Sequence, residues 1–173
     1  AEKAKPYLVD KKVDISGQKS LISIQPIGLV LGIMPWNFPF WQVFRFAIPT
    51  ITAGNGAILK HASNVQGCAA AIEKCFIDSG FLENIFRNLV IPGQEVAEVI
   101  KDPSIAAVTL TGSTPAGKSV AETAGSVLKK TVLELGGSDP YVILEDADLV
   151  VATDACVTGR TLNAGQSCIG AKR

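Results

Sequence analysis

The sequence contains few of the residues that metalloproteins and disulfide-rich proteins depend on. It has one histidine, His61, and four cysteines in 173 residues, and no two of the cysteines form a CxxC pair. A zinc site needs more soft ligands than this, and a disulfide framework needs a higher density of cysteine. We therefore expect that the chain has no metal site and that its thiols are free. We also expect a reducing, cytoplasmic compartment.

Excess charge and long apolar runs are missing as well. The 16 basic side chains balance 16 acidic ones without a block of like charge, which argues against a nucleic acid or an anionic membrane surface as partner. No apolar run reaches the roughly 20 residues of a membrane-spanning helix. What the chain does have is 47% hydrophobic residues, enough to bury a sizeable core. A small-molecule partner fits this composition best.

Short apolar strands alternate with helical patterns along most of the chain. Predicted strands cover residues 20–33, 57–60, 85–90, 106–110 and 141–144, and predicted helices cover 40–52, 65–79, 94–101, 116–124 and 149–162. This alternation predicts an α/β fold with a doubly wound parallel sheet, a Rossmann-like cofactor domain. Ligands of such sheets bind beyond the carboxyl ends of the strands, where Lys60 and residues 111–113 are expected.

A glycine-rich segment, Gly112–Gly117, lies between a predicted strand and a predicted helix. Gly112 permits close backbone approach, Pro115 suits the first helical turn, and the free N–H groups of a helix start bind phosphate. Followed by Lys118-Ser119, the segment also completes the G-x-x-x-x-G-K-S pattern of a P-loop nucleoside triphosphatase. Against that alternative, it follows several βα units and no Walker-B acid is evident downstream. A glycine turn without a ligand is the other alternative.

Three polar side chains stand in places that suit acyl chemistry. Cys168 follows the polar Gly165-Gln166-Ser167 turn and is a candidate nucleophile, whereas the other cysteines lie among apolar residues at helical spacing. Glu134 lies between leucines, and burial would make this carboxylate more basic, as a general base requires. Asn37, among aromatic residues and prolines, is a candidate oxyanion donor. The alternatives are a small buried hydrophobe, a solvated strand residue and a turn-forming asparagine, respectively.

Five motifs in order resemble the aldehyde dehydrogenase superfamily, over nearly the whole chain. They are Pro35-Trp36-Asn37-Phe38-Pro39, Leu59-Lys60, Thr111-Gly112-Ser113 with Gly117, Leu133-Glu134-Leu135-Gly136-Gly137 and Gly165-Gln166-Ser167-Cys168. The resemblance overrides the P-loop interpretation and implies oxidation of an aldehyde to a carboxylic acid. It implies that Cys168 attacks the aldehyde, that Asn37 and the Cys168 N–H stabilise the oxyanion, and that Glu134 activates water to hydrolyse the thioester.

The resemblance also implies the cofactor and the substrate. Lys60 would contact the adenosine ribose and Ser113 the pyrophosphate of NAD or NADP, with Trp36, Gly112 and Gly117 completing the site. Ser63 stands where NAD-preferring relatives often carry a glutamate that repels a 2′-phosphate, so NADP should be accepted. Arg45 stands where succinate semialdehyde dehydrogenases bind the substrate carboxylate. Residues 60–64 and 135–140 also resemble the bacterial branch of these enzymes. An exposed helix residue or a salt bridge is the alternative for Arg45.

The same resemblance predicts the organisation of the chain. We expect residues 1–25 to form a helix end and an oligomerisation-arm strand, 26–137 a dinucleotide-binding domain, and 138–173 the beginning of a truncated catalytic domain. Family chains are more than twice as long, so we expect a fragment that ends just after Cys168. Such a fragment would be catalytically incomplete and at most a dinucleotide-binding module, while the full-length enzyme would be a homodimer or homotetramer.

Overall fold

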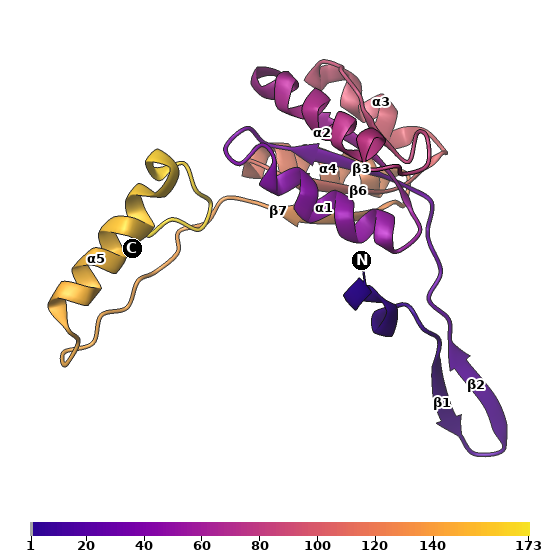
Figure 1. Cartoon of the computed structure of the whole chain (residues 1–173), viewed down its shortest axis with the longest axis horizontal. Coiled ribbons are helices and arrows are strands. Elements are labelled where there is room, and N and C mark those ends of the chain that lie inside the picture. The colour runs from indigo at the N-terminus through magenta and orange to yellow at the C-terminus, as the bar shows by residue number, and fades with distance from the viewer. Residues whose placement is uncertain (1) are drawn as a thin grey trace.

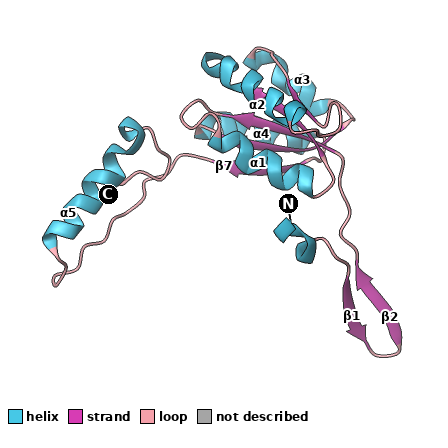
Figure 2. Ribbon diagram, in the orientation of Figure 1, coloured by secondary structure: helices cyan, strands magenta, loops and turns pink. Residues whose placement is uncertain are grey.

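A computed structural model describes residues 2–173, so the part of the predicted N-terminal helix end that falls on Ala1 lies outside the described residues. Its centre is a parallel sheet with strand order β5-β4-β3-β6-β7 (Figures 1 and 2). The strands are β3 (Leu29–Met34), β4 (Gly56–His61), β5 (Phe86–Asn88), β6 (Ile105–Thr111) and β7 (Lys130–Glu134). The connecting helices are α1 (Trp41–Thr52), α2 (Gln66–Asp78), α3 (Val96–Lys101) and α4 (Thr114–Ser126). The predicted doubly wound α/β fold is confirmed.

Helices cover both faces of this sheet because its strands are apolar on both sides. On one face, α1 and α2 pack on β3, β4 and β5 through Phe46, Leu59, Ile72 and Phe86, among others. On the other face, α3 and α4 pack on β6 through Ile100, Val108, Leu110 and Val120, among others. Burying each such large side chain stabilises the fold by about 1.5–3 kcal/mol.

One glycine allows α1 to approach the sheet closely. A Cβ on Gly32, in the middle of β3, would lie 2.3 Å from Cε1 of Phe46, whose ring covers this strand. Since real Cβ atoms do not come that close to a ring carbon, only glycine fits at this position.

The strand order reverses direction at β3. From β3 the chain moves outward through β4 to β5, then crosses to β6 on the other side of β3 and on to β7. The crevice between the carboxyl ends of β3 and β6 is the topological switch point, where doubly wound sheets bind their ligands.

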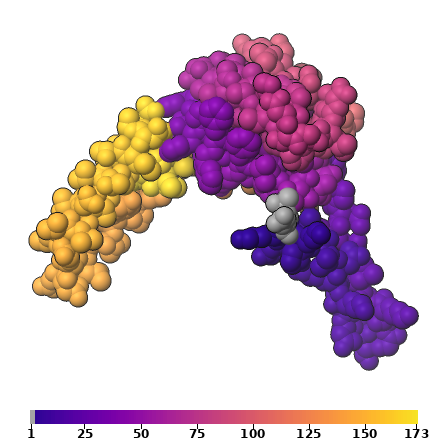
Figure 3. Space-filling model, in the orientation of Figure 1, coloured from indigo at the N-terminus to yellow at the C-terminus, as the bar shows by residue number. Residues whose placement is uncertain are grey.

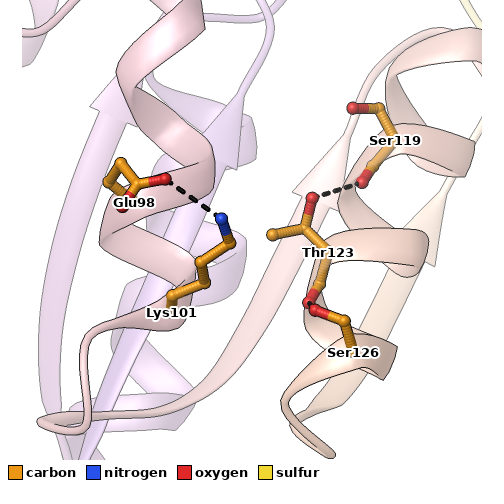
Figure 4. A network of polar contacts seen from close by, with 5 residues as sticks. All are labelled: Glu98, Lys101, Ser119, Thr123 and Ser126. Carbon is orange, nitrogen blue, oxygen red and sulfur yellow. Dashed lines mark hydrogen bonds and ion pairs between the residues drawn. The ribbon is translucent and has the colours of Figure 1, made fainter.

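The two helices α3 and α4 lie beside each other and are stabilised locally on their exposed surfaces (Figure 4). On α3, Lys101 Nζ lies 3.1 Å from Glu98 Oε1, a pair three residues apart. On α4, the Thr123 hydroxyl donates to the Ser119 carbonyl at 2.9 Å and the Ser126 hydroxyl to the Thr123 carbonyl at 2.7 Å. Such exposed contacts contribute little, about 1 kcal/mol or less each.

The single strand predicted over residues 20–33 is wrong, because the structure divides it into two. β2 (Gln18–Ile22) pairs with β1 (Lys11–Ile15) in an antiparallel hairpin that projects from the body, and β3 begins only at Leu29. Between them Gly28 has φ +119°, and Asn55 Oδ1 accepts hydrogen bonds from the N–H groups of Ile27 and Gly28 at 2.7 and 3.0 Å. These two donors bond to a side chain instead of a neighbouring strand.

The strand predicted over residues 141–144 is also wrong. This segment is mostly exposed, and the only sheet-like pairing nearby is an isolated bridge between Asp139 and Ala171. Without a neighbouring strand, the apolar pattern of the segment has nothing to pair with. The helix that follows, α5 (Leu149–Thr161), is confirmed, and its N-cap Asp148 accepts from two N–H groups. Figure 3 shows the C-terminal segment lying to one side of the sheet body.

Over residues 2–173 we find no helix long and apolar enough to cross a membrane. The same residues contain no cluster of three or more histidine, cysteine, aspartate or glutamate side chains arranged to hold a metal ion.

Candidate active site

A cavity of about 410 Å³ opens at the carboxyl ends of β3, β6 and β7. Segments far apart in the sequence line it, including Trp36, Asn37, Gly112, Ser113, Glu134 and Cys168. The predicted nucleophile, oxyanion donor and general base therefore share one cavity, which lies at the switch point of the sheet.

The loop before the predicted nucleophile has an unusual backbone. Asn163, Ala164 and Gly165 have φ angles of 52°, 56° and 75°, three left-handed residues in succession within η4 (Leu162–Gly165). Alanine rarely adopts this conformation, which costs of order 1 kcal/mol or more and persists only where surrounding contacts hold it. Cys168 follows this loop, half-buried and with a free thiol.

Asn37 is one of the contacts that hold the loop. Its side-chain Nδ2 donates to the Gln166 carbonyl at 2.9 Å, and its own carbonyl accepts from Asn163 Nδ2 at 2.7 Å. An amide nitrogen carries two hydrogens, so one donor of Asn37 is left for an oxyanion beside Cys168.

A buried histidine fixes the loop that carries Asn37. His61, fully buried at the end of β4, places Nε2 3.0 Å from the Pro39 carbonyl, while Nδ1 lies 3.0 Å from the Ala62 N–H. Nδ1 also lies 3.1 Å from the Met34 carbonyl, so the ring joins the end of β3 to the loop at Pro39. The single histidine of the chain thus has a structural role in holding the loop after β3.

Of the two alternatives for Glu134, a buried carboxylate and a solvated strand residue, the structure shows the solvated one. Its side chain is 48% exposed, and Oε1 lies 2.7 Å from Nη2 of Arg45, which is itself 44% exposed. The reason is its position as the last residue of β7, a strand at the edge of the sheet, where the side chain leaves the packed core. The salt-bridge alternative for Arg45 is what the structure shows.

Arg45 lies in a second cavity of about 390 Å³. Gln42, Met34 and Phe46 help to line it, and it shares Thr111 and Glu134 with the first cavity. Arg45 itself does not line the first cavity, so Glu134 forms the connection between the arginine and the predicted nucleophile.

The start of α4 has the geometry of a phosphate-binding helix end. Ser113 caps this helix by accepting from the Ala116 N–H at 3.4 Å, and helix N-termini favour anions. A Cβ on Gly112 would meet only the side chain of its neighbour Leu110, at 3.5 Å, so the space above Gly112 is open to a ligand. The residues present therefore fit the pyrophosphate of a dinucleotide.

The other features of this glycine segment are explained by packing. A Cβ on Gly117 would lie 2.6 Å from Cδ2 of Leu135, so this glycine lets α4 pack against the chain beyond β7. The helix already begins at Thr114, so residues 114–119 do not form the extended phosphate loop of a P-loop protein.

Three of the predicted cofactor residues, Gly117, Lys60 and Ser63, do not line the first cavity. Lys60 is half-buried near the end of β4, and Ser63 is exposed at the start of η2 (Ser63–Val65). Because β4 is the neighbour of β3, both residues lie along the same carboxyl edge of the sheet as the cavity, farther from Cys168 in strand order.

One residue of the cavity, Lys172, was not predicted from the sequence. Its Nζ donates to the carbonyl of Gly137 at 2.9 Å and to that of Cys168 at 2.8 Å. Among the described residues, Lys172 is the one basic side chain that lines the first cavity. No local pattern could have identified it, because its partners are carbonyls and one of them lies 35 residues away.

A doubly wound sheet with a cavity at the switch point is the architecture of dinucleotide-binding enzymes. Comparison with known proteins shows which of these is present: the chain belongs to the aldehyde dehydrogenase family, which it matches over residues 1–173.

The chain is similar to several individual members of this family. The chain is 55% identical to a probable succinate-semialdehyde dehydrogenase (NADP(+)) of Synechocystis sp., covering 100% of this chain and 38% of that protein. It is 51% identical to the succinate semialdehyde dehydrogenase (NAD(P)+) Sad of Escherichia coli, covering 99% and 36%. The crystal structure of succinic semialdehyde dehydrogenase from Streptococcus pyogenes with NADP+ superposes with a TM-score of 0.96 at 38% identity, covering 99% and 38%. The chain thus spans well under half the length of these relatives.

Proposed function

We propose that the protein is an NAD(P)-dependent aldehyde dehydrogenase that oxidises succinate semialdehyde to the corresponding carboxylic acid. The observation that carries this proposal is the convergence of Cys168, Asn37 and Glu134 on one cavity at the switch point. The names of the similar proteins support the choice of substrate and cofactor.

The catalytic steps follow from the side chains in this cavity. The Cys168 thiolate attacks the aldehyde carbon to give a thiohemiacetal, and the free N–H of Asn37 and the backbone N–H of Cys168 donate to the oxyanion. A nicotinamide cofactor, when bound, would supply the hydride acceptor that the conversion of a thiohemiacetal on Cys168 to a thioester requires. Glu134 takes a proton from water, which attacks the thioester carbonyl, releasing the acid and the thiol.

Arg45 is proposed to bind the second carboxylate of the substrate. Its guanidinium already binds a carboxylate, that of Glu134, and half of its surface is accessible to an incoming anion. Binding of the substrate carboxylate would compete with Glu134 for Arg45. The general base would then be released when the substrate binds.

The cofactor is proposed to lie along the carboxyl edge of the sheet. Gly112, Ser113 and Trp36 would hold its pyrophosphate and nicotinamide portions, and Lys60 with Ser63 would contact the adenosine ribose. Ser63 carries no charge to repel a 2′-phosphate, so NADP is the favoured cofactor. Gly117 would contribute indirectly, by letting α4 pack closely enough to place its N-terminus at the cavity.

The setting of the enzyme is part of the same proposal. We propose a cytoplasmic homodimer or homotetramer in which the β1–β2 hairpin is the oligomerisation arm. Most of this hairpin is exposed, including Ile15, Leu21 and Ile22, and its outer edges have unpaired backbone groups that suit strand addition.

Replacing the predicted nucleophile tests the activity. In the full-length protein that contains this chain, Cys168→Ala should reduce NADP reduction with succinate semialdehyde to background. Cys156→Ala, which changes a half-buried cysteine of α5, should leave it unchanged. Full activity in Cys168→Ala would remove the proposed nucleophile. NADP binding without turnover in the wild type would favour a dinucleotide-binding module.

A further inference from the structure

The ammonium group of Lys172 connects the two chain segments that carry the proposed base and the proposed nucleophile. One acceptor is the carbonyl of Gly137, three residues beyond Glu134, and the other is the carbonyl of Cys168 itself. The two segments also lie close together, since a Cβ added to Gly137 would be 3.6 Å from the Cys168 oxygen. One side chain therefore bridges a contact that sets the separation of base and nucleophile.

The backbone that carries this lysine is itself well anchored. The N–H of Lys172 donates to the Asp139 carbonyl at 3.1 Å, that of Ala171 to the Gly159 carbonyl at 3.1 Å, and that of Tyr141 to the Arg173 carbonyl at 2.7 Å. These bonds fix the point from which the Lys172 side chain extends. The ammonium group is thus directed at the two carbonyls by the fold and not by chance on a mobile surface segment.

The loop that carries Cys168 needs a contact like that of Lys172 on the side facing away from β3. Asn37 holds it from the β3 side through the Gln166 carbonyl, at 2.9 Å. The strained run from Asn163 to Gly165 lies just before the cysteine, and strained backbone persists only where its surroundings define it. Fixing the Cys168 carbonyl restricts the backbone dihedral of the cysteine and therefore the direction of its thiol.

We propose that Lys172 is a positioning residue that clamps Gly137 to Cys168 and so holds the nucleophile at a fixed place relative to Glu134. This rests on the proposed function in one respect, the role of Cys168 as nucleophile. Lys172 does not touch the reacting atoms in this proposal. It affects how Cys168 and Glu134, which do touch them, are arranged.

Two variants and one matched control test the clamp. Lys172→Met keeps most of the side-chain volume but removes the donors, and Lys172→Arg restores donors that can reach two carbonyls. The control is Lys129→Met, because Lys129 Nζ also donates to two carbonyls, those of Ile100 and Asp102, on the far side of the fold from the cavity. It measures the general cost of losing a lysine with two carbonyl partners.

Amide hydrogen exchange followed by mass spectrometry gives a readout that does not depend on activity. In Lys172→Met, peptides containing Gly170, Ala171 and Tyr141 should exchange about tenfold faster, because their hydrogen bonds close the same loop. Lys172→Arg should exchange within about threefold of the wild type, and Lys129→Met should leave these peptides unchanged. Unchanged exchange in Lys172→Met would overturn the proposal.

Steady-state kinetics of the full-length protein separates positioning from a merely structural role. Lys172→Met should lower kcat about tenfold with KM within about twofold, since misplacing a nucleophile slows the chemical step and leaves substrate binding intact. Lys172→Arg should recover most of kcat, and Lys129→Met should retain it. An unaltered kcat in Lys172→Met would overturn the proposal. If the wild type oxidises no aldehyde, the proposed function fails, whereas the exchange experiment still decides the clamp.

Discussion

Replacing Arg45 by glutamine separates its contact with Glu134 from its proposed contact with the substrate. The Arg45–Glu134 pair is short, at 2.7 Å, but the side chains are 44% and 48% exposed. Exposed ion pairs contribute about 0.2–1 kcal/mol. Arg45→Gln should therefore lower the melting temperature by no more than about 4 °C.

The expected effect on catalysis is larger and depends on the aldehyde. A hydrogen bond to a charged group contributes about 1.5–3 kcal/mol, which corresponds to about 10- to 100-fold in kcat/KM. Arg45→Gln should lose this factor with succinate semialdehyde. Butanal has the same chain length but no carboxylate, so it cannot displace Glu134 from Arg45. Freeing Glu134 should then raise turnover of butanal by up to about fivefold, the equivalent of 1 kcal/mol.

Steady-state kinetics with both aldehydes at saturating NADP is the assay. Lys118→Gln is a suitable control, because this exposed lysine on α4 does not line either of the two cavities around Glu134. An equal loss with both aldehydes in Arg45→Gln would refute the reasoning. It would mean that Arg45 acts through Glu134 or through the fold and not through the substrate carboxylate.

Two further predictions concern the scaffold. Gly32→Ala should destabilise the protein by about 1–3 kcal/mol in thermal or urea unfolding, because the new methyl group meets the Phe46 ring. Gly67→Ala on α2, where an added Cβ meets nothing within 4 Å, should retain or gain up to about 1 kcal/mol, and an equal loss in both would contradict the packing argument. The pKa of Asp102 is lowered by hydrogen bonds from the Ser104 hydroxyl and N–H, so this contact stabilises the fold above about pH 4 and is lost as the pH falls through the lowered pKa. Ser104→Ala removes the hydroxyl and keeps the N–H, so it should move the Asp102 pKa part of the way back toward its usual value in an NMR titration. An unmoved titration would exclude the Ser104 hydroxyl as a cause.

The sequence allowed the parallel fold to be predicted because apolar periodicity reports burial locally. Strands β4 and β6 and helices α1, α2, α4 and α5 lie within a few residues of their predicted places. The wrong predictions concern segments in which pairing with a neighbouring strand decides the structure. Residues 141–144 have the apolar pattern of a strand, but a strand also needs a neighbour, and the residue pattern does not show whether one is present.

In the candidate site, too, some features could be predicted from the sequence and others could not. Its chemical groups could be named in advance, because Asn37, Glu134 and Cys168 each stand in a distinctive local motif. Their environments could not. The leucine neighbours of Glu134 left open whether its side chain is buried or solvated, and its exposure follows from its position at the end of an edge strand beside Arg45.

The sequence by itself thus determined the type and order of the main elements and the identity of the candidate site residues, since both depend on neighbours along the chain. The tertiary structure alone decided how those groups are held. Asn37 reaches Gln166 across 129 residues and Lys172 reaches Gly137 across 35, and each bonds to a backbone carbonyl. Every residue has such a carbonyl, so only the folded arrangement of the chain determines which one a side chain meets.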